Sequence, residues 1–370
     1  MNDKKPSVRA ISSVAVFAAV IFGFTVLNRV LTPPVISQSE RRPLATMPPI
    51  SAEGIASAKF MDGFENFAAD SFAFRDGFRT IRAAVTLGAF AQSDKDGLYI
   101  GDSGAGKFQK LDEKSARNVG RKIAAVADTL GGLNVYYTFV PDKSVYAGRY
   151  MPGFDPETAE RILAEELPDS RYIDITGALS GGDFYRTDLH WSQPRIGGVV
   201  GCLAGAMGFE FAPMGAPVTA GTFSGVYSGQ IALPLAPDVM EYIPMTDGVT
   251  VEYINENTLA WEPGEAYDTA AFGGRDPYDL FLSGSKPLVR IDNPAAPTDR
   301  ELYLFRDSFG SSLAPLLAGS YRRVTLIDLR YVDSRVLPEL MTFAPGSDAL
   351  FIYSSQILNS DSALLVTDTR

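Results

Sequence analysis

The longest uninterrupted apolar stretch of the chain covers residues 10–27 and contains no charged residue. As a helix, these 18 residues would be about 27 Å long, close to the hydrocarbon thickness of a bilayer. Lys4, Lys5 and Arg9 precede the stretch, so the positive-inside rule keeps the N-terminus in the cytoplasm. We therefore expect residues 1–30 to form a cytoplasmic tip and a single-pass signal anchor in a bacterial cytoplasmic membrane. The rest of the chain would then lie in the periplasm or on the cell surface.

Two other interpretations of this stretch stay open. A cleavable signal peptide needs a site with small residues close behind the apolar run, and only the distant Ser37 and Ser39 approach that pattern. A buried core helix is the second alternative, although a core helix does not need basic flanks at an N-terminus.

Helical spacing of apolar residues begins after a proline-rich linker over residues 31–50. Phenylalanines recur three and four positions apart over residues 60–67, and apolar residues continue this spacing over residues 74–85. We expect these side chains to pack in the core of a domain that covers residues 51–370.

From residue 97 onward, the pattern alternates between short apolar runs and helical periods. Alternating strands and helices imply right-handed crossovers and a parallel sheet that is covered on both faces. Residues 209–300 are rich in Gly, Pro, Tyr and Phe and show few helical periods, so we expect an irregular, β-leaning insertion there. The expected elements are a hairpin at 97–108, strands at 133–140, 171–175, 301–305, 323–329 and 349–353, and helices at 112–131, 156–166, 194–208, 311–319 and 335–343.

The composition excludes several classes of protein. Apolar residues make up 46% of the chain and charged residues 21%, which is ordinary for a globular protein and unlike a disordered or polytopic membrane protein. The net charge of −11, with no basic cluster, argues against a nucleic-acid partner. Cys202 is the only cysteine and His190 the only histidine, so an intramolecular disulfide, a cysteine-based zinc site and a multi-histidine metal site are excluded. We expect no metal and no cofactor.

The first candidate for chemistry is the segment from Tyr185 to Trp191. In an extended segment, Asp188 and His190 would point to the same side, because residues two apart share a face. A carboxylate beside an imidazole fixes its tautomer and makes it a usable general base. The alternative is a lone histidine that only makes a hydrogen bond at the surface.

The second candidate is Ser308, which follows an apolar strand and precedes a helix. Sites in open α/β sheets gather at this edge, and the helix N-terminus offers free N–H groups to an oxyanion. The alternative is that Ser308 only caps the helix. The segment Gly101-Asp102-Ser103 matches the GDS motif of the GDSL hydrolases more closely than Arg306-Asp307-Ser308 does. Ser103, however, lies in a hairpin rather than before a helix. We therefore prefer Ser308.

Together, these two segments resemble the DHHW family of bacterial proteins and, more distantly, the SGNH-hydrolase-like domains of alginate O-acetyltransferases. The resemblance covers nearly the whole chain, from the N-terminal anchor onward. There are two departures from the family pattern: Leu189 stands where the family has the first His of Asp-His-His-Trp, and Ser285 follows Gly284 where the family tends to have Gly-Asn. Further segments that carry the resemblance are RRPL at 41–44, ADSFAFR at 69–75, GLYIG at 97–101, VPDK at 140–143, YDLFLSG at 278–284 and IDLRY at 327–331.

The resemblance implies an α/β fold, an SGNH-hydrolase-like three-layer α/β/α sandwich with a parallel sheet. It also implies a triad in which Ser308 attacks an acyl carbonyl, His190 is the base and Asp188 orients it. The Ser308 N–H is one candidate oxyanion donor, and Gly284 and Ser285 are weaker ones. The basic candidates for substrate contact have structural ion pairs as their alternative, and Trp191 can instead pack under the site. The substrate-contact candidates are Lys143, Tyr185, Arg186, Trp191, Arg306 and Arg330.

The implied function is that of a membrane-anchored serine O-acyltransferase of the O-acetyl type, or an esterase, acting on a cell-envelope polysaccharide. A membrane-bound O-acyltransferase is the expected source of the acyl group, as it is for the relatives. A non-catalytic module that binds polysaccharide or protein is the alternative, and the missing asparagine at Ser285 motivates it. A cytosolic hydrolase is a third alternative, which requires that residues 10–27 do not insert into a membrane.

Overall fold

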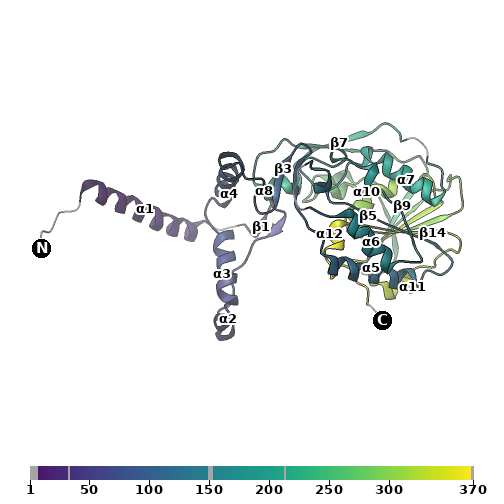
Figure 1. Ribbon diagram of the computed structural model, residues 1–370, viewed down its shortest axis with the longest axis horizontal. Helices are drawn as coiled ribbons and strands as arrows, with labels where there is room; N and C mark the ends of the chain where they lie inside the picture. Colours follow the sequence, from purple (N-terminus) through teal and green to yellow (C-terminus); the bar gives the residue numbers. More distant parts are fainter. Residues whose placement is uncertain (1–6, 32–33, 149–152, 212–213, 368–370) are drawn as a thin grey trace. The chain divides into compact units, whose positions relative to one another are not determined.

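The computed structural model of the chain describes residues 7–31, 34–148, 153–211 and 214–367 (Figure 1). It divides into two compact units, Met1–Gln92 and Ser93–Arg370, whereas the sequence analysis places a boundary near residue 50. The boundary differs because residues 51–92 make their contacts with the segment before them, for instance through the ion pair between Arg42 and Asp70.

The first unit begins with α1 (Val8–Val30), the expected apolar helix. Its window Ile11–Asn28 has a mean hydropathy of 2.1 and is not buried by the described residues, so the core-helix interpretation is wrong. Its length and composition suit a membrane span. Lys4 and Lys5, and residues 32 and 33 of the linker, lie outside the described residues. The other elements of this unit are β1 (Ile36–Ser37), β2 (Arg42–Pro43), α2 (Ala52–Ala56), α3 (Lys59–Asp70), α4 (Arg75–Ala83) and the π-helix η1 (Ala84–Ala89).

The apolar side chains of α3 and α4 do not form a core. The two helices are present where their spacing predicts them, but Phe64, Phe74, Phe78 and Ile81 are all exposed. The prediction of core packing is therefore wrong. The reason is that α4 turns arginines, not its apolar side, toward the rest of this unit.

The second unit is built on an eight-stranded sheet with the order β10-β9-β11-β13-β12-β14-β5-β6. The strands from β13 to β6 are parallel, and β11, β9 and β10 continue the sheet in antiparallel fashion. The sheet is thus mostly parallel. Its strands are β5 (Asn134–Val140), β6 (Arg171–Tyr172), β9 (Thr250–Ile254), β10 (Trp261–Gly264), β11 (Leu288–Asp292), β12 (Glu301–Arg306), β13 (Arg323–Ile327) and β14 (Asp348–Ser354).

Alternate residues of the central strands enter two separate hydrophobic cores. In β12, Leu302 and Leu304 belong to one core and Tyr303 and Phe305 to the other, as the pleat of a strand requires. The first core also includes side chains of α7 and α10, and the second includes those of α5 and α6, which Figure 1 places on either side of the sheet. The helices of this unit are α5 (Glu113–Ala127), α6 (Pro156–Glu166), α7 (Gly197–Met207), α8 (Val226–Ile231), α9 (Thr269–Phe272), α10 (Ser308–Leu317), α11 (Leu337–Leu340) and α12 (Ser355–Leu358).

The segment expected to be an irregular insertion, residues 209–300, is partly built into the main sheet. It contributes β9, β10 and β11, and β7 (Val218–Phe223) pairs with β8 (Asp238–Tyr242) in a separate two-stranded sheet. Residues 212 and 213 lie outside the described part of the chain. The expected glycine-rich hairpin is confirmed as β3 (Leu98–Gly101) and β4 (Gly104–Lys107), whereas the helix expected at 335–343 is shortened to η7 (Ser334–Val336) and α11.

Candidate active site

Asp188 and His190 lie in a tight loop whose two ends pair at Phe184 and Trp191. The N–H of Tyr185 donates to the His190 carbonyl at 3.0 Å, so the loop closes on itself. The extended conformation expected from the sequence is therefore wrong. The bent loop nevertheless brings the two side chains together.

Two buried charged side chains hold this loop in place. Asp238, the first residue of β8, accepts hydrogen bonds from the N–H groups of Arg186 and Thr187, each at 2.7 Å. Lys143, which follows β5, donates to the Tyr185 carbonyl at 2.5 Å and to a carbonyl of the β3–β4 hairpin at 2.8 Å. Burial lowers the pKa of Lys143 to about 8, although nearby carboxylates, Asp238 first among them, oppose this shift. The loop is thus fixed by groups that come from three other parts of the chain.

A continuous line of hydrogen bonds joins Asp188, His190 and Ser308. Asp188 Oδ1 lies 2.7 Å from His190 Nδ1, and His190 Nε2 lies 2.8 Å from Ser308 Oγ. The second carboxylate oxygen of Asp188 accepts from the Val226 N–H at 3.0 Å. An ionised carboxylate only accepts hydrogen bonds, so Nδ1 carries the proton and Nε2 is free to accept from the serine hydroxyl. Asp188 and His190 are buried, while Ser308 is partly exposed.

Ser308 is the first residue of α10 and directly follows the parallel strand β12 and Asp307. The cap of α10 is Asp307, whose Oδ1 accepts from the Phe309 N–H at 3.0 Å, so the interpretation of Ser308 as a mere cap is wrong. The other oxygen of Asp307 accepts from the Ser354 N–H at the end of β14, 2.8 Å away. Within the described part of the chain, no group accepts a hydrogen bond from the Ser308 N–H. This N–H points out of the first turn of the helix, where an oxyanion would be stabilised.

Tyr278 orients the histidine, a role that the sequence pattern does not predict. Its ring is stacked on the imidazole of His190, with centroids 3.7 Å apart and an interplanar angle of 7°. Its hydroxyl donates to Ser312 Oγ at 2.7 Å, and the indole N–H of Trp191 donates to the same oxygen at 2.9 Å. Burial raises the pKa of Tyr278 well above its usual range, so the hydroxyl remains a donor at any working pH. Trp191 therefore packs beneath the site rather than facing a sugar ring.

The weaker oxyanion candidates are not positioned to act. The Gly284 N–H already donates to the Phe281 carbonyl at 3.2 Å. Ser285 is exposed, and among the described residues no hydrogen bond joins it to the serine, histidine or aspartate of the site. Neither residue replaces the asparagine that the family pattern would place here.

Most of the expected substrate-contact residues turn out to be structural. Tyr185, Trp191, Lys143 and Arg306 are buried, so they cannot touch a substrate from solvent. Arg186 is exposed next to the loop and remains a candidate. Ser103 lies in the turn of the β3–β4 hairpin, where its buried hydroxyl has no hydrogen-bond partner among the described residues, whereas the hydroxyl of Ser308 lies next to His190. In the described part of the chain, no cluster of three His, Cys, Asp or Glu residues could hold a metal ion.

Arg306 and Arg330 both pair with the buried carboxylate of Asp328. The guanidinium of Arg306 lies 3.3 Å from Asp328 Oδ2, and Arg330 donates to both oxygens at 2.8 and 2.7 Å. Burial lowers the pKa of Arg306. In Arg330, burial is the largest single effect and acts in the same direction, but the hydrogen bonds to Asp328 and the negative charge of that carboxylate together outweigh it and raise the pKa. These arginines thus hold the carboxyl ends of β12 and β13 together under the site.

Asp328→Asn is expected to lower the free energy of unfolding by about 3–5 kcal/mol, because it leaves the buried Arg306 without its counter-ion. The measurement is thermal and chemical unfolding in detergent, followed by tryptophan fluorescence. Glu252→Gln removes one of the two carboxylate partners of the partly exposed Arg290 and is the matched control, with a loss of about 1 kcal/mol or less. Equal losses for the two variants would contradict the structural role of Asp328.

A glycine lets α8 approach the loop of the site very closely. A Cβ atom at Gly225 would lie 2.3 Å from the Thr187 carbonyl oxygen and 2.5 Å from the Cβ of Asp188. Gly225→Ala is therefore expected to displace Asp188 and to lower kcat by roughly 100-fold, since small misplacements of catalytic groups cost that much. Gly205→Ala, in α7, meets nothing within 4 Å and should leave kcat unchanged. Ester turnover of both variants checks this, and equal kcat values would contradict it.

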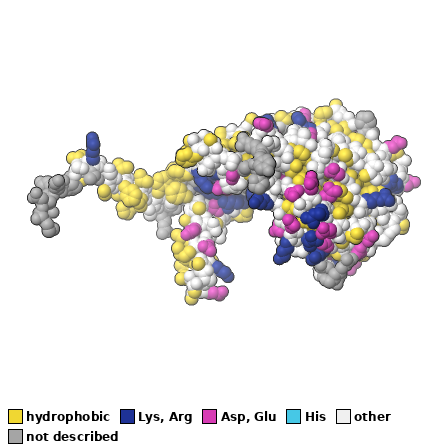
Figure 2. Space-filling view, viewed as in Figure 1, with side chains coloured by type: hydrophobic (Ala, Val, Ile, Leu, Met, Phe, Trp, Pro, Cys, Tyr) yellow, Lys and Arg dark blue, Asp and Glu magenta, His cyan; other side chains and the backbone are white. Residues whose placement is uncertain are grey.

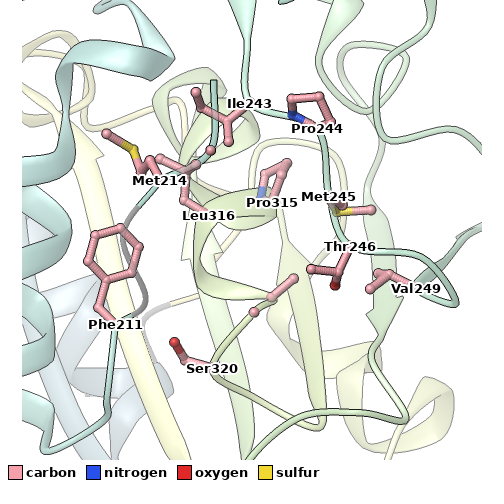
Figure 3. A pocket seen from close by; sticks show the side chains of 13 residues that line it. Phe211, Met214, Ile243, Pro244, Met245, Thr246, Val249, Pro315, Leu316 and Ser320 are labelled. Carbon is pink, nitrogen blue, oxygen red and sulfur yellow. The ribbon is translucent and has the colours of Figure 1, made fainter. Parts of the chain in front are cut away.

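A separate apolar cavity of about 130 Å³ lies at the far end of α10 (Figure 3). Met214, Ile243, Pro315 and Leu316 are among the residues that line it. With a rise of 1.5 Å per residue, Leu316 lies about 12 Å along the helix from Ser308. The cavity is therefore not part of the candidate site.

Comparisons with known proteins find the fold but no close relative. No family model and no curated protein sequence matches this chain. A DHHW family protein from Eubacterium siraeum aligns over 73% of this chain and 94% of its own, with a TM-score of 0.58 and 18% identity. This chain has the fold of that DHHW family protein.

Bacillus cereus PatB1 has the same fold. It aligns over 72% of this chain and 99% of its own with a TM-score of 0.57 and 14% identity, and a second structure is described as carrying a sulfonyl adduct. The O-acetyltransferase domain of Pseudomonas putida AlgJ also matches, over 71% of this chain and 92% of its own at 14% identity, but its TM-score of 0.41 is too low to carry an argument. At these identities, the likeness to the DHHW protein and to PatB1 establishes a shared mixed α/β fold.

Proposed function

We propose that this protein is a membrane-anchored, extracytoplasmic serine O-acyltransferase, of the O-acetyl type, or an esterase, acting on a cell-envelope polysaccharide. The observation that carries the proposal is the hydrogen-bonded line from Asp188 through His190 to the partly exposed Ser308. The two hydrophobic cores on opposite faces of the sheet agree with a three-layer sandwich of SGNH-hydrolase type. Open α/β sheets bind their ligands beyond the carboxyl ends of the strands, and Ser308 directly follows β12 at such an end.

In the first half-reaction, Ser308 Oγ attacks the carbonyl carbon of the acyl donor while its proton moves to His190 Nε2. Asp188 stabilises the imidazolium that forms, and the Ser308 N–H at the start of α10 donates to the oxyanion. The bond to the leaving group then breaks, and the imidazolium gives its proton to that group. An acyl-serine remains.

In the second half-reaction, a sugar hydroxyl loses its proton to His190 Nε2 and attacks the carbonyl carbon of the acyl-serine. The bond between that carbon and Ser308 Oγ then breaks, the imidazolium returns its proton to Ser308 Oγ, and the acylated sugar leaves. Water in place of the sugar gives the esterase reaction.

The apolar helix α1 supports the membrane location, with the N-terminus inside. The acyl group would be supplied from the membrane side by a membrane-bound O-acyltransferase. The proposed acceptor lies outside, in the cell-envelope polysaccharide.

The function is tested with the purified full chain in detergent, p-nitrophenyl acetate as donor and a soluble cell-wall oligosaccharide as acceptor. A transferase produces acetylated oligosaccharide that mass spectrometry detects, and nitrophenol release rises with acceptor concentration. An esterase releases nitrophenol at a rate independent of the acceptor. Absence of both nitrophenol release and an acetyl adduct would contradict the catalytic proposal.

A polysaccharide- or protein-binding module is the second candidate. The observation that favours it is the engaged Gly284 N–H together with the exposed Ser285, which leaves the oxyanion hole with one evident donor. This candidate predicts that Ser308→Ala keeps the cellular phenotype, whereas the catalytic proposal predicts that the phenotype is lost.

A further inference from the structure

In the first unit, the partners of α4 on its inner side are charged. Arg75 and Arg79 reach Glu40, at 2.5 and 3.2 Å, and Arg75 also approaches Asp70 at 3.1 Å. Arg42 donates to both oxygens of Asp70, and its hydrogen bonds lower the pKa of that carboxyl to about 2. Arg42 is partly exposed, but the side chains of Glu40, Asp70, Arg75 and Arg79 are only 8–17% exposed, so a network of ion pairs occupies the place of a core.

The apolar side of α4 faces outward. Phe74 is 64% exposed, Phe78 46% and Ile81 60%, and Phe90, just beyond η1, is 71% exposed. A helix on a water-soluble protein has the opposite arrangement, with its apolar stripe toward the core and its charges toward solvent. An exposed cluster of large apolar side chains marks a surface that is covered by something other than water.

This outward apolar side is continuous with the membrane helix. The ring of Phe24 in α1 stacks on Phe72, with centroids 5.1 Å apart, and lies 5.8 Å from the ring of Phe78. Asn28 of α1 accepts a hydrogen bond from the N–H of Ala73 at 2.7 Å. Phe24 belongs to the 18-residue window that is apolar enough to span a bilayer, so its ring partners lie at the depth of the outer end of that span. Figure 2 shows hydrophobic side chains along α1.

We propose that α4 and the adjoining segment 72–74 lie in the outer interface of the lipid bilayer, with Phe74, Phe78 and Ile81 among the acyl chains. The proposal rests on the membrane location given under the proposed function. In this position, lipid covers the apolar side chains, and the ion-pair network faces the aqueous side. A helix with one apolar and one charged side is the type that lies in such an interface. α4 would then attach the chain to the membrane together with α1, so that α1 is not the only attachment.

The test uses the full chain with Cys202→Ala, reconstituted in vesicles of phosphatidylcholine and phosphatidylglycerol, with one nitroxide label at a time. The labelled variants are Phe78→Cys and Ile81→Cys on the apolar side, Asp76→Cys and Thr80→Cys opposite, and Phe17→Cys in α1. We expect the ratio of collisions with oxygen to collisions with a water-soluble nickel complex to be several-fold higher at 78 and 81 than at 76 and 80. Position 17 should give the highest ratio.

Two outcomes would overturn the proposal. If the labels at 78 and 81 collide with the nickel complex as often as those at 76 and 80, this side of α4 faces water. A label at position 17 that still faces lipid would then show that α1 is nevertheless inserted in the membrane. Positions 78 and 81 closed to both reagents would show that a second copy or another protein covers them. A label at 17 that is open to nickel would instead remove the membrane location on which the proposal rests. Turnover of p-nitrophenyl acetate by each labelled protein reports separately on the catalytic proposal.

Discussion

Ser308→Ala is expected to lower acyl-ester turnover by roughly 10⁴-fold or more, mainly through kcat. In the proposed mechanism, this hydroxyl forms the covalent bond to the acyl group, and it lies 2.8 Å from the base. Alanine removes the nucleophile but not the cap of α10, because Asp307 provides that cap. The variant should therefore keep the wild-type Tm while it loses activity. The measurement is kcat and KM for p-nitrophenyl acetate, with Tm by fluorescence.

Ser103→Ala is the matched control for this experiment. It makes the same chemical change in the GDS sequence of the β3–β4 hairpin, where the hydroxyl has no partner among the described residues. We expect kcat close to that of the wild type. Activity that survives Ser308→Ala and disappears with Ser103→Ala would show that the wrong serine has been assigned.

Asp188→Asn is expected to lower kcat by about 10⁴-fold while the fold is retained. The carboxylate accepts from His190 Nδ1 at 2.7 Å and so keeps Nε2 free to take the serine proton. An asparagine amide can donate to Nδ1 instead, which places the imidazole proton on Nε2 and removes the base. His190 is the only histidine of the chain, so nitrogen NMR of histidine-labelled protein reports this tautomer without overlap.

Asp333→Asn controls for the substitution itself, because Asp333 caps η7 and pairs with the exposed Arg335. It should change neither the tautomer nor kcat. If Asp188→Asn also keeps a proton on Nδ1 and the wild-type kcat, Asp188 does not orient the histidine.

The parts of the site that the sequence predicts are those whose signal is local. An apolar strand, a polar turn and a small-residue helix meet within a few residues around Ser308, and this pattern places the serine at the sheet edge. Asp188 and His190 are two residues apart, so their contact is also a local matter, although the backbone bends rather than extends.

The parts that the sequence does not predict depend on contacts between distant residues. Tyr278 stacks on a histidine 88 positions earlier in the chain, and Asp238 accepts a hydrogen bond from a loop residue 51 positions earlier. The periodicity of apolar residues does not predict such pairs. Arg306 was expected to face substrate because it ends a strand, but Asp328, which directly follows the neighbouring strand β13, pairs with it inside the protein. β9 and β11 are only five residues long each, and Gly and Pro lie near their ends. Their sequence pattern is therefore too short to predict that they belong to the main sheet.

The exposure of the phenylalanines in the first unit was likewise not predictable from their spacing. Helical spacing predicts the helices but not the medium that surrounds their apolar side. Only the ion pairs of Arg75 and Arg79 with Glu40 show that the charged side is turned inward.

A serine-directed sulfonyl fluoride shows whether His190 activates Ser308 as a nucleophile. The full chain is treated with the reagent, digested with trypsin, and the modified residue located by tandem mass spectrometry in the peptide of residues 307–322. We expect a single sulfonyl adduct on Ser308 in the wild-type protein and no adduct in Ser308→Ala or His190→Ala. An adduct on Ser103, or an adduct on Ser308 that forms equally fast in His190→Ala, would contradict it.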